Sequence, residues 1–151
     1  MTQVQIECLV KGFPRQEVYE TLKDADVYRR NAPDRVKSVE TAASLDGKGA
    51  VTDWEVYFRN GLLAWSEQDF YDDEACVLSF EQIDGDFDTF EGSWVAADGD
   101  EPDEVKLVFR ADFDFGVPSL ESIVAPVAVR VLTQTMSNIV LQVFPGSSIV
   151  Q

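Results

Sequence analysis

Residues 53–70 read DWEVYFRNGLLAWSEQDF, and the prediction of the fold starts from them. At their centre, Asn60-Gly61 is the strongest short-range signal for a two-residue type I′ turn, because both central residues of that turn need positive φ. The sequence therefore predicts a β-hairpin with these two residues as its loop. The cross-strand partners are then Arg59 with Leu62, Phe58 with Leu63, Val56 with Trp65, Trp54 with Glu67 and Thr52 with Asp69.

One face of this hairpin is predicted to be mostly apolar and to point inward. Its members are Trp54, Val56, Phe58, Leu63, Trp65, Glu67 and Asp69. The opposite face carries Asp53, Glu55, Tyr57, Ala64, Ser66 and Gln68 and is typical of the solvated side of an antiparallel sheet. Slipping the register by one residue would bury Asp53, Glu55 and Gln68, so the faces are well specified. A carboxylate, Glu67, thus shares a face with two tryptophans.

Length and charge narrow the class of protein. The chain of 151 residues suits one domain, residues 1–151, which can bury roughly 70% of its unfolded surface without a metal or disulfide. Lys and Arg number 12 and Asp and Glu 28, giving a formal net charge of −16. Nucleic acid and membrane surfaces are therefore not expected as partners. The acidic runs fall at predicted strand connections and are expected to be solvated loops.

The sequence contains no histidine, which removes the commonest proton shuttle and metal ligand. We expect no metal and no cofactor, because neither zinc-ligand spacing nor a glycine-rich phosphate loop is present. Two cysteines, Cys8 and Cys76, lie in predicted strands and are expected to be buried free thiols. With no signal-type start or membrane span, a cytoplasmic protein is predicted, either monomer or homodimer.

The remaining elements follow from periodicity and turn signals. Before the hairpin we expect a strand at residues 3–10, helices at Arg15–Lys23 and Asp26–Asn31, and a strand at Val36–Leu45. After it, residues 76–83 and 87–95 form a second hairpin with a three-residue loop, Asp84-Gly85-Asp86. In that hairpin Phe80 opposes Phe90, Leu78 opposes Gly92 and Cys76 opposes Trp94.

The last third of the chain predicts a strand followed by a long helix. In EVKLVFRADFDF, residues 104–115, every second residue from Val105 is apolar, as in a half-buried antiparallel strand. Ser119 is predicted to cap a largely buried helix from Leu120 to about Phe144, in which Pro126 removes a backbone hydrogen bond. The fold class is α+β: a curved seven-stranded antiparallel sheet around a long C-terminal helix, with two short helices after the first strand.

Such a sheet and helix can enclose an internal cavity. The inward positions include many aromatic residues: Trp54, Phe58, Trp65, Phe80, Phe90, Trp94, Phe109, Phe113 and Phe115. These rings can simply fill a core, and that alternative stays open. The polar residues predicted on the same faces, Glu67, Asp69, Gln82 and Asp88, favour a roomy pocket instead, because unpaired polar groups in a dry core are costly.

The chain resembles the START-like, helix-grip superfamily, and within it the polyketide cyclase/dehydratase and aromatase/cyclase branch, with coenzyme Q-binding proteins as relatives. The resemblance rests on the element order and on four segments: YRRNAPDRVKSVE, WEVYFRNGLLAWSE, FEQIDGDFDTFEGSW and FDFGVPSLESIVAP. It implies a cavity in which a poly-β-ketone chain undergoes aldol ring closure and dehydration. The aromatase/cyclases carry Trp, Ser and Arg at alternate positions of the hairpin's second strand, where this chain has Trp65, Glu67 and Asp69.

Because acids replace the family's hydroxyl and cation, a different mechanism centres on Glu67. A carboxyl group beside Trp54 and Trp65 is desolvated, which raises its pKa and suits it to general acid or base catalysis. Gln82 is expected to hydrogen-bond an enolate or keto oxygen. By analogy with family pockets, Tyr28 and Asn138 are added to the substrate-binding set. The expected set is Tyr28, Trp54, Phe58, Trp65, Asp69, Phe80, Asp88, Phe90, Trp94, Phe109, Phe113 and Asn138.

Several alternatives stay open at this point. Glu67 can instead pair with a strand neighbour or with Arg29, Arg30 or Arg35. Asp69 and Asp88 can be solvated residues at the pocket mouth. The protein can be a non-catalytic carrier of a quinone, polyketide or lipid, or a module whose acidic surface binds another protein. If an acyl carrier protein delivers the substrate, Arg29, Arg30 and Arg35 are the predicted docking cluster, because they form the only dense group of cations.

Overall fold

The computed structural model describes residues 1–46, 49–58 and 61–150. The described residues form eleven elements in the order β1 Thr2–Lys11, α1 Arg15–Leu22, α2 Ala25–Asn31, β2 Val36–Ala43, β3 Gly49–Phe58, β4 Gly61–Asp72, β5 Val77–Gly85, β6 Thr89–Asp98, β7 Glu104–Asp114, α3 Pro118–Val143 and β8 Ser148–Ile149. This confirms the predicted α+β class and the element order, with each predicted helix and strand within a few residues of its expected bounds.

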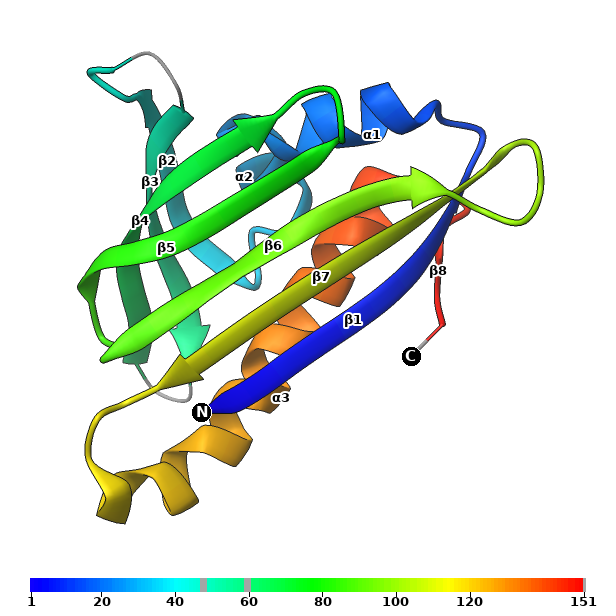
Figure 1. Cartoon of the computed structure of the whole chain (residues 1–151). Coiled ribbons are helices and arrows are strands. Elements are labelled where there is room, and N and C mark those ends of the chain that lie inside the picture. The colour runs from blue at the N-terminus through cyan, green and yellow to red at the C-terminus, as the bar shows by residue number, and fades with distance from the viewer. Residues whose placement is uncertain (47–48, 59–60, 151) are drawn as a thin grey trace.

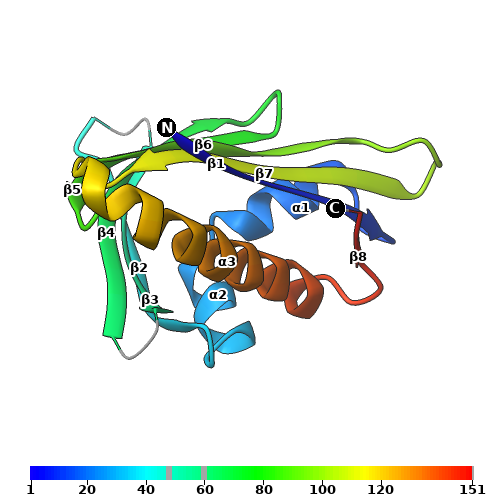
Figure 2. The same cartoon turned by 90° about the horizontal axis from the view of Figure 1, so that it is seen from below.

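The described strands form one antiparallel sheet in the order β2-β3-β4-β5-β6-β7-β1-β8. The sheet curls so that β2, β3 and β4 turn down beside α3, which lies in the concave side together with α1 and α2 (Figures 1 and 2). The sheet has one strand more than predicted. The two-residue β8 pairs with Cys8 and Leu9 of β1. A strand of two residues is too short to show an alternating pattern in the sequence, so it was not predicted.

The β3–β4 hairpin has the predicted faces but a different register. Phe58 pairs with Gly61, Trp54 with Trp65 and Thr52 with Glu67, so every partner is displaced by two residues from the prediction. Gly61 therefore belongs to β4 and not to the loop, while the predictions for Arg59 and Asn60 fall outside the described residues. A displacement of two preserves which side chains point inward, because the side-chain period of a strand is two.

The β5–β6 hairpin departs from prediction in the same way. Phe80 pairs with Gly92 and Leu78 with Trp94, and Asp84 and Gly85, predicted as loop residues, extend β5 along β4. The β4–β5 pairing contains an irregularity: Ser66 pairs with Asp84, but Glu67 pairs with Gln82. One residue of β5 is thus left over immediately before Glu67, and such bulges bend a strand and re-aim the side chains beside it.

The long helix α3 begins earlier than predicted and is less buried. Val117 occupies the N-cap without a side-chain hydrogen bond and Pro118 opens the helix, so the predicted cap, Ser119, lies inside the first turn. Proline suits this position because its missing N–H is not needed there. Only one side of α3 faces the sheet (Figure 2), and Leu120 and Ile123 are exposed. The helix is apolar and long enough to span a membrane, but its inner face belongs to the protein core.

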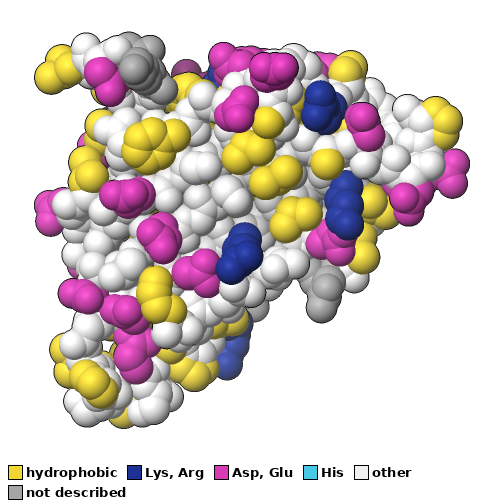
Figure 3. All heavy atoms as spheres, in the orientation of Figure 1, with side chains coloured by type: hydrophobic (Ala, Val, Ile, Leu, Met, Phe, Trp, Pro, Cys, Tyr) yellow, Lys and Arg dark blue, Asp and Glu magenta, His cyan; other side chains and the backbone are white. Residues whose placement is uncertain are grey.

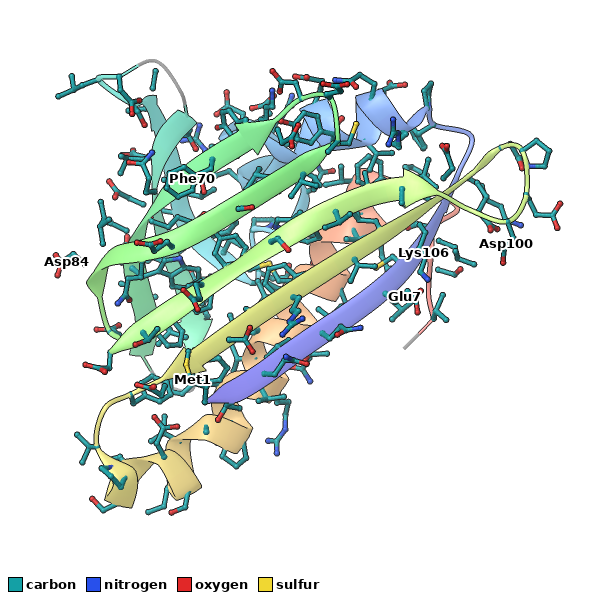
Figure 4. All side chains as sticks on the ribbon, in the orientation of Figure 1. Met1, Glu7, Phe70, Asp84, Asp100 and Lys106 are labelled. Carbon is teal, nitrogen blue, oxygen red and sulfur yellow. The ribbon has the colours of Figure 1, made fainter. Side chains whose placement is uncertain are left out.

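The outer face of the sheet is polar and acidic. Acidic side chains and scattered apolar ones cover it, and few Lys or Arg are present (Figure 3). Strand β7 alternates as predicted, with Leu107 and Phe109 buried and Lys106 exposed. Lys106 reaches Glu7 of β1 at 2.5 Å on this outer side (Figure 4). Both cysteines are buried free thiols, as predicted, although Cys76 precedes β5 in a left-handed conformation.

Candidate active site

Most of the concave interior is filled by aromatic rings in contact with one another. Trp54 stacks on Trp65 with ring centroids 5.8 Å apart, and Phe90 lies 5.0 Å from Trp65 and 5.3 Å from Phe80. Phe109 continues the series, 5.8 Å from Phe80. These rings sit at favourable separations for aromatic pairs and are buried. The alternative of a ring-filled core therefore holds for this half of the interior, which we call the aromatic half.

The polar residues lie at the other end of the same strands, around a small cavity of about 20 Å³. It is lined by Leu22, Lys23, Tyr28, Thr41, Thr52, Trp54, Glu67, Asp69, Tyr71, Leu78 and Trp94. That volume accommodates about one water molecule, so the predicted roomy pocket is wrong for this conformation. The cavity nevertheless gathers four predicted site residues besides Glu67: Tyr28, Trp54, Asp69 and Trp94. We call the group Thr41, Thr52, Glu67, Asp69 and Tyr71 the polar half.

Glu67 and Asp69 form a buried, hydrogen-bonded pair of carboxyl groups on β4. Their exposed fractions are 6% and 4%, so the alternative of Asp69 as a solvated mouth residue is wrong. Burial raises the pKa of both groups. The bond to Asp69 raises the pKa of Glu67 further, whereas hydrogen bonds from Glu67 and Thr52 partly lower that of Asp69. Burial thus favours a pair that holds one proton between its two carboxyl groups, one of them neutral and the other ionised.

Hydroxyl and indole groups complete the pair's hydrogen bonds. The indole N–H of Trp65 donates to Glu67 Oε1 at 2.8 Å, and the hydroxyl of Thr52 donates to Asp69 Oδ2. Thr41 Oγ1 lies 3.0 Å from Thr52 Oγ1. Because the Thr52 proton is given to Asp69, Thr41 is the donor in that contact. Asp69 Oδ1 is buried and has no hydrogen-bond partner within the described ranges, so it remains available as an acceptor.

No ion pair joins Glu67 or Asp69 to a cation among residues 1–46, 49–58 and 61–150. The arginines weighed as partners for Glu67 make other contacts. Arg29 pairs with Asp26, Arg30 Nε donates to the Asp26 carbonyl at 3.3 Å, and Arg35 donates to Gln134 of α3 at 3.3 Å. The interpretation of Glu67 as half of an arginine ion pair is therefore wrong for these three.

Three predicted site residues lie elsewhere. Gln82 is half-buried, and its side-chain amide is hydrogen-bonded to the loop after β5. It donates to the Phe87 carbonyl at 2.8 Å and accepts from the Phe87 N–H at 3.3 Å. Asp88 is exposed, because the chain leaves the sheet's inner face in this loop. Asn138 of α3 does not line the small cavity, although its Oδ1 is buried without a partner in the described part of the chain. None of the three therefore reaches the carboxyl pair.

The other predicted aromatic residues belong to the core. Phe58 is half-buried at the end of β3, whereas Trp65, Phe80, Phe90, Phe109 and Phe113 are buried. Tyr28 packs against Trp54 with centroids 5.2 Å apart, and its hydroxyl donates to the Leu22 carbonyl. Burial, and then the neighbouring carboxyl groups, raise the pKa of Tyr28, so it is a neutral phenol.

The structure adds residues that the sequence analysis did not single out. Thr52 and Tyr71 continue the inward alternation of β3 and β4 by one step, and that alternation was the available signal. Thr41 pairs with Thr52 across β2 and β3. Phe87 is buried against Phe90, with centroids 4.5 Å apart; it was predicted to begin the strand of residues 87–95 but lies in the loop between β5 and β6.

An open groove of about 620 Å³ adjoins the small cavity. It runs between α2 and the β2–β3 edge, and its lining includes Asp24, Arg29 and Asp53. Lys23 and Thr41 line both spaces, so they form the wall between them. Lys23 is held there by Asp73 at 2.9 Å, with its Nζ 4.7 Å from the centroid of the Tyr71 ring. The carboxyl pair thus lies one side chain away from an open surface.

Within the described residues no cluster of three or more His, Cys, Asp or Glu side chains is arranged to hold a metal. The arrangement supports proton transfer by a protonated and an ionised carboxyl group. The profile of a family described as "Polyketide cyclase / dehydrase and lipid transport" matches residues 12–140. No curated protein matches the sequence.

Several solved structures share the fold. A protein of Thermus thermophilus, TTHA0849, superposes with a TM-score of 0.81 at 21% identity, covering 94% of each chain. The ZhuI aromatase/cyclase of Streptomyces sp. R1128 gives 0.78 at 17% identity, covering 94% of this chain and 93% of its own. A START superfamily protein of Mycobacterium smegmatis gives 0.70 at 15% identity over 92% of both chains. These neighbours confirm the predicted helix-grip fold.

Proposed function

Because the chain belongs to the polyketide cyclase / dehydrase and lipid transport family, we propose that it is a cofactor-independent cyclase/dehydratase acting on a reactive poly-β-keto substrate. The observation that carries this proposal is the buried pair of Glu67 and Asp69. Two carboxyl groups held together in an apolar interior are costly to stability and separate into an acid and a base. Binding a hydrophobic ligand requires neither group.

In the proposed reaction Asp69 is the base and Glu67 the acid. Asp69 takes a proton from a carbon between two carbonyl groups, and the resulting enolate attacks a second carbonyl carbon of the same chain. A carbon–carbon bond forms, the attacked C=O becomes an alkoxide, and Glu67 gives its proton to that oxygen. Transfer of the new proton from Asp69 to Glu67 restores the pair. Loss of water then repeats the exchange: the base removes a carbon-bound proton and the acid protonates the departing hydroxide.

The groove supports this proposal because it supplies the space that the cavity lacks. A volume of about 620 Å³ falls within the usual range of ligand sites, roughly 300–1,000 Å³. We place the body of the substrate in the groove and its reacting end at the carboxyl pair, which requires Lys23 or Tyr71 to move aside. Lys23 is paired with Asp73, whose side chain is exposed, so breaking this ion pair to move Lys23 aside costs little free energy.

Replacing each carboxyl group by its amide tests the proposal. With a synthetic poly-β-keto thioester of N-acetylcysteamine as substrate, E67Q and D69N should each lower kcat by about 10²–10⁴-fold, as loss of a general acid or base does. E91Q, on the exposed outer side of β6, is the matched control and should leave kcat unchanged. Product is followed by mass spectrometry as loss of water. Wild-type rates in E67Q and D69N, or tight binding without any turnover, would contradict the enzyme and favour the carrier.

We also propose that an acyl carrier protein can deliver the substrate, in the cytoplasm, at the groove beside α2. Arg29 and Arg30 are exposed on that helix, and Arg29 lines the groove. Arg35 is half-buried against α3 and is the least accessible of the three. Charge reversal by R29E/R30E should raise KM for a carrier-bound chain and leave KM for the N-acetylcysteamine thioester unchanged. Equal KM values for the carrier-bound chain before and after reversal would refute this docking site.

A further inference from the structure

The hydrogen bonds of the polar half form a continuous path from the open groove to the carboxyl pair. Thr41 on β2 is exposed and lines the groove, Thr52 on β3 is 4% exposed, and Asp69 on β4 is 4% exposed. Cross-strand pairing sets this row, because Thr41 pairs with Thr52 and Thr52 with Glu67. Three neighbouring strands thus each contribute one step of a path from solvent to Asp69.

We propose that Thr41 and Thr52 are a proton relay through which the buried Glu67–Asp69 pair exchanges protons with solvent. Thr41 Oγ1 lies 3.0 Å from Thr52 Oγ1, and Thr52 donates to Asp69. A proton arriving at Thr41 moves that hydroxyl's own proton to Thr52, whose proton passes to Asp69. Each hydroxyl gains one proton and loses one, so both end neutral. This inference deepens the proposed function and rests on it, since the pair must hold one proton to act.

Among the described residues, the other groups around the pair do not offer an equivalent path. Lys23 also lines both spaces, but its amine is bound to Asp73 at 2.9 Å and to Glu20 at 3.3 Å. Tyr28 of α2 gives its hydroxyl proton to the Leu22 carbonyl. Within the described ranges the Tyr71 hydroxyl of β4 is hydrogen-bonded to neither carboxyl group, whose hydroxyl and indole donors are Thr52 and Trp65, and Trp65 can only donate. The two threonines are therefore the hydroxyl groups whose hydrogen bonds connect the pair to the groove.

The relay predicts a function for an exposed residue that exchanges no proton with the substrate in the proposed reaction. Thr41 acts only through Thr52, and so is a positioning residue. Its replacement by valine keeps the shape of the side chain and removes the hydroxyl. T41V should fold like the wild type, because Thr41 is exposed on β2. T41S keeps the hydroxyl and should behave as the wild type in proton exchange.

Infrared spectroscopy of the intact protein tests the relay without a substrate. As the acid of the proposed pair, Glu67 has a neutral carboxyl group whose C=O stretch shifts when its proton is replaced by deuterium, so a rapid change into D₂O reports its exchange. T41V and T52V should each slow this exchange by about tenfold or more, which corresponds to about 1.4 kcal/mol on the barrier. T41S and T52S should restore it. S38A is the matched control, because Ser38 donates to Glu55 across the same two strands, at 2.6 Å and outside the path.

The outcomes separate the relay from the function on which it rests. If the wild type shows no neutral carboxyl band, or E67Q does not remove it, the acid role of Glu67 and the proposed function fail. If the band is present but T41V exchanges at the wild-type rate, the relay alone is refuted. Backbone amide exchange measured on the same samples controls for local opening. A slowdown in S38A equal to that in T41V would also refute the relay, because the effect would then belong to the sheet edge.

Discussion

The aromatic half and the polar half are built on the same strands by the same alternation, yet they affect the stability of the fold in opposite ways. On β4, Trp65 packs against Trp54 and Phe90, and the gain is dispersion and burial of apolar surface. Two positions further on, Glu67 is equally buried, and its neighbour on the same face is another carboxyl group. The first arrangement stabilises the fold, whereas the second is tolerated by it.

The direction of a side chain and its chemical surroundings are therefore set by different parts of the structure. The strand period decides that both side chains point inward. What each meets there is decided by the partner strands, the bulge before Glu67 and the cover provided by α1 and α2. A carboxyl pair without a cation in the described chain is then a local cost that the ring cluster next to it offsets.

The aromatic half should carry the larger share of stability. Phe90 is 1% exposed and contacts Trp65, Phe80 and Phe87, so F90A should lower the free energy of unfolding by about 3–5 kcal/mol. F70A is the matched control: Phe70 is 48% exposed on the outer face (Figure 4), and its loss should stay within about 0.5 kcal/mol. Urea denaturation measures both. If F90A lowered the free energy of unfolding by no more than F70A does, the idea of a tightly packed aromatic half would be contradicted.

In the polar half, removing one hydroxyl should cost less than removing a ring but more than a surface change. T52V keeps the side-chain volume but leaves Asp69 without its hydroxyl donor, so we expect a loss of about 1–3 kcal/mol in the free energy of unfolding. In the D69N background the same change should cost less, because the ionised acceptor is gone. A double-mutant cycle measured by urea denaturation supplies the coupling energy. Equal costs in both backgrounds would show that Thr52 stabilises the sheet and not the carboxylate.

The carboxyl pair should also make stability depend on pH. The pKa of Glu67 is raised in the folded state, so between its unfolded and folded pKa values the folded protein binds the extra proton. The stabilisation of the neutral group is therefore fully present below the unfolded pKa of about 4.3 and is lost as pH rises through the folded pKa. The stability difference between wild type and E67Q should fall with rising pH, with a limiting slope of about 1.4 kcal/mol per pH unit.

E67Q is the right reference because the many exposed carboxylates change stability in both proteins alike and cancel in the difference. Measurements of urea midpoints from about pH 5 upward are sufficient, since the unfolded glutamate is largely ionised there. A difference that stays flat, or that grows with pH, would mean that Glu67 is ionised in the folded protein. The aromatic half offers the contrasting case: F90A should show no pH dependence of its own.

Sequence reasoning found the faces of both halves because a strand period of two survives a register error of two. It therefore placed Glu67 and Asp69 inside although it assigned Thr52 to the wrong partner. Turn position failed because the Asn60-Gly61 signal is local, whereas the strand pairing is set by the whole sheet. The exposure of α3 could not be read from its apolar composition, since that depends on how much of the helix the curved sheet covers.

The size of the interior was beyond prediction for a related reason. The alternation of apolar residues identifies the rings that point inward. Whether those rings touch and fill the interior depends on their volumes and on how the sheet curves around them. Phe87 closes part of that space from the loop between β5 and β6, where the sequence predicts the start of a strand, and the Gln82 side chain is bound to this loop. The hydrogen bonds around the carboxyl pair could likewise be predicted only from the correct strand register, because Thr41 and Thr52 become neighbours only when β2 pairs with β3.

The smallest expected effect on stability concerns the wall between the polar half and solvent. Lys23 pairs with Asp73 and Glu20, whose side chains are 67% and 51% exposed, so K23A should cost at most about 1 kcal/mol. Its effect on access should be larger, because Lys23 covers a cavity that Trp54 and Trp94 line. Acrylamide quenching of tryptophan fluorescence should therefore increase in K23A.

The matched control for this access test is K106A, which removes an ion pair with Glu7 on the outer face of the sheet. All three tryptophans are buried, with exposed fractions of 3–6%, so extra quenching in K23A reports a change in the cavity wall. It should be confined to part of the emission, because Trp65 is enclosed by the aromatic half. Equal quenching in K23A, K106A and the wild type would mean that the polar half is closed by the fold itself, and a substrate would then have to enter by another route.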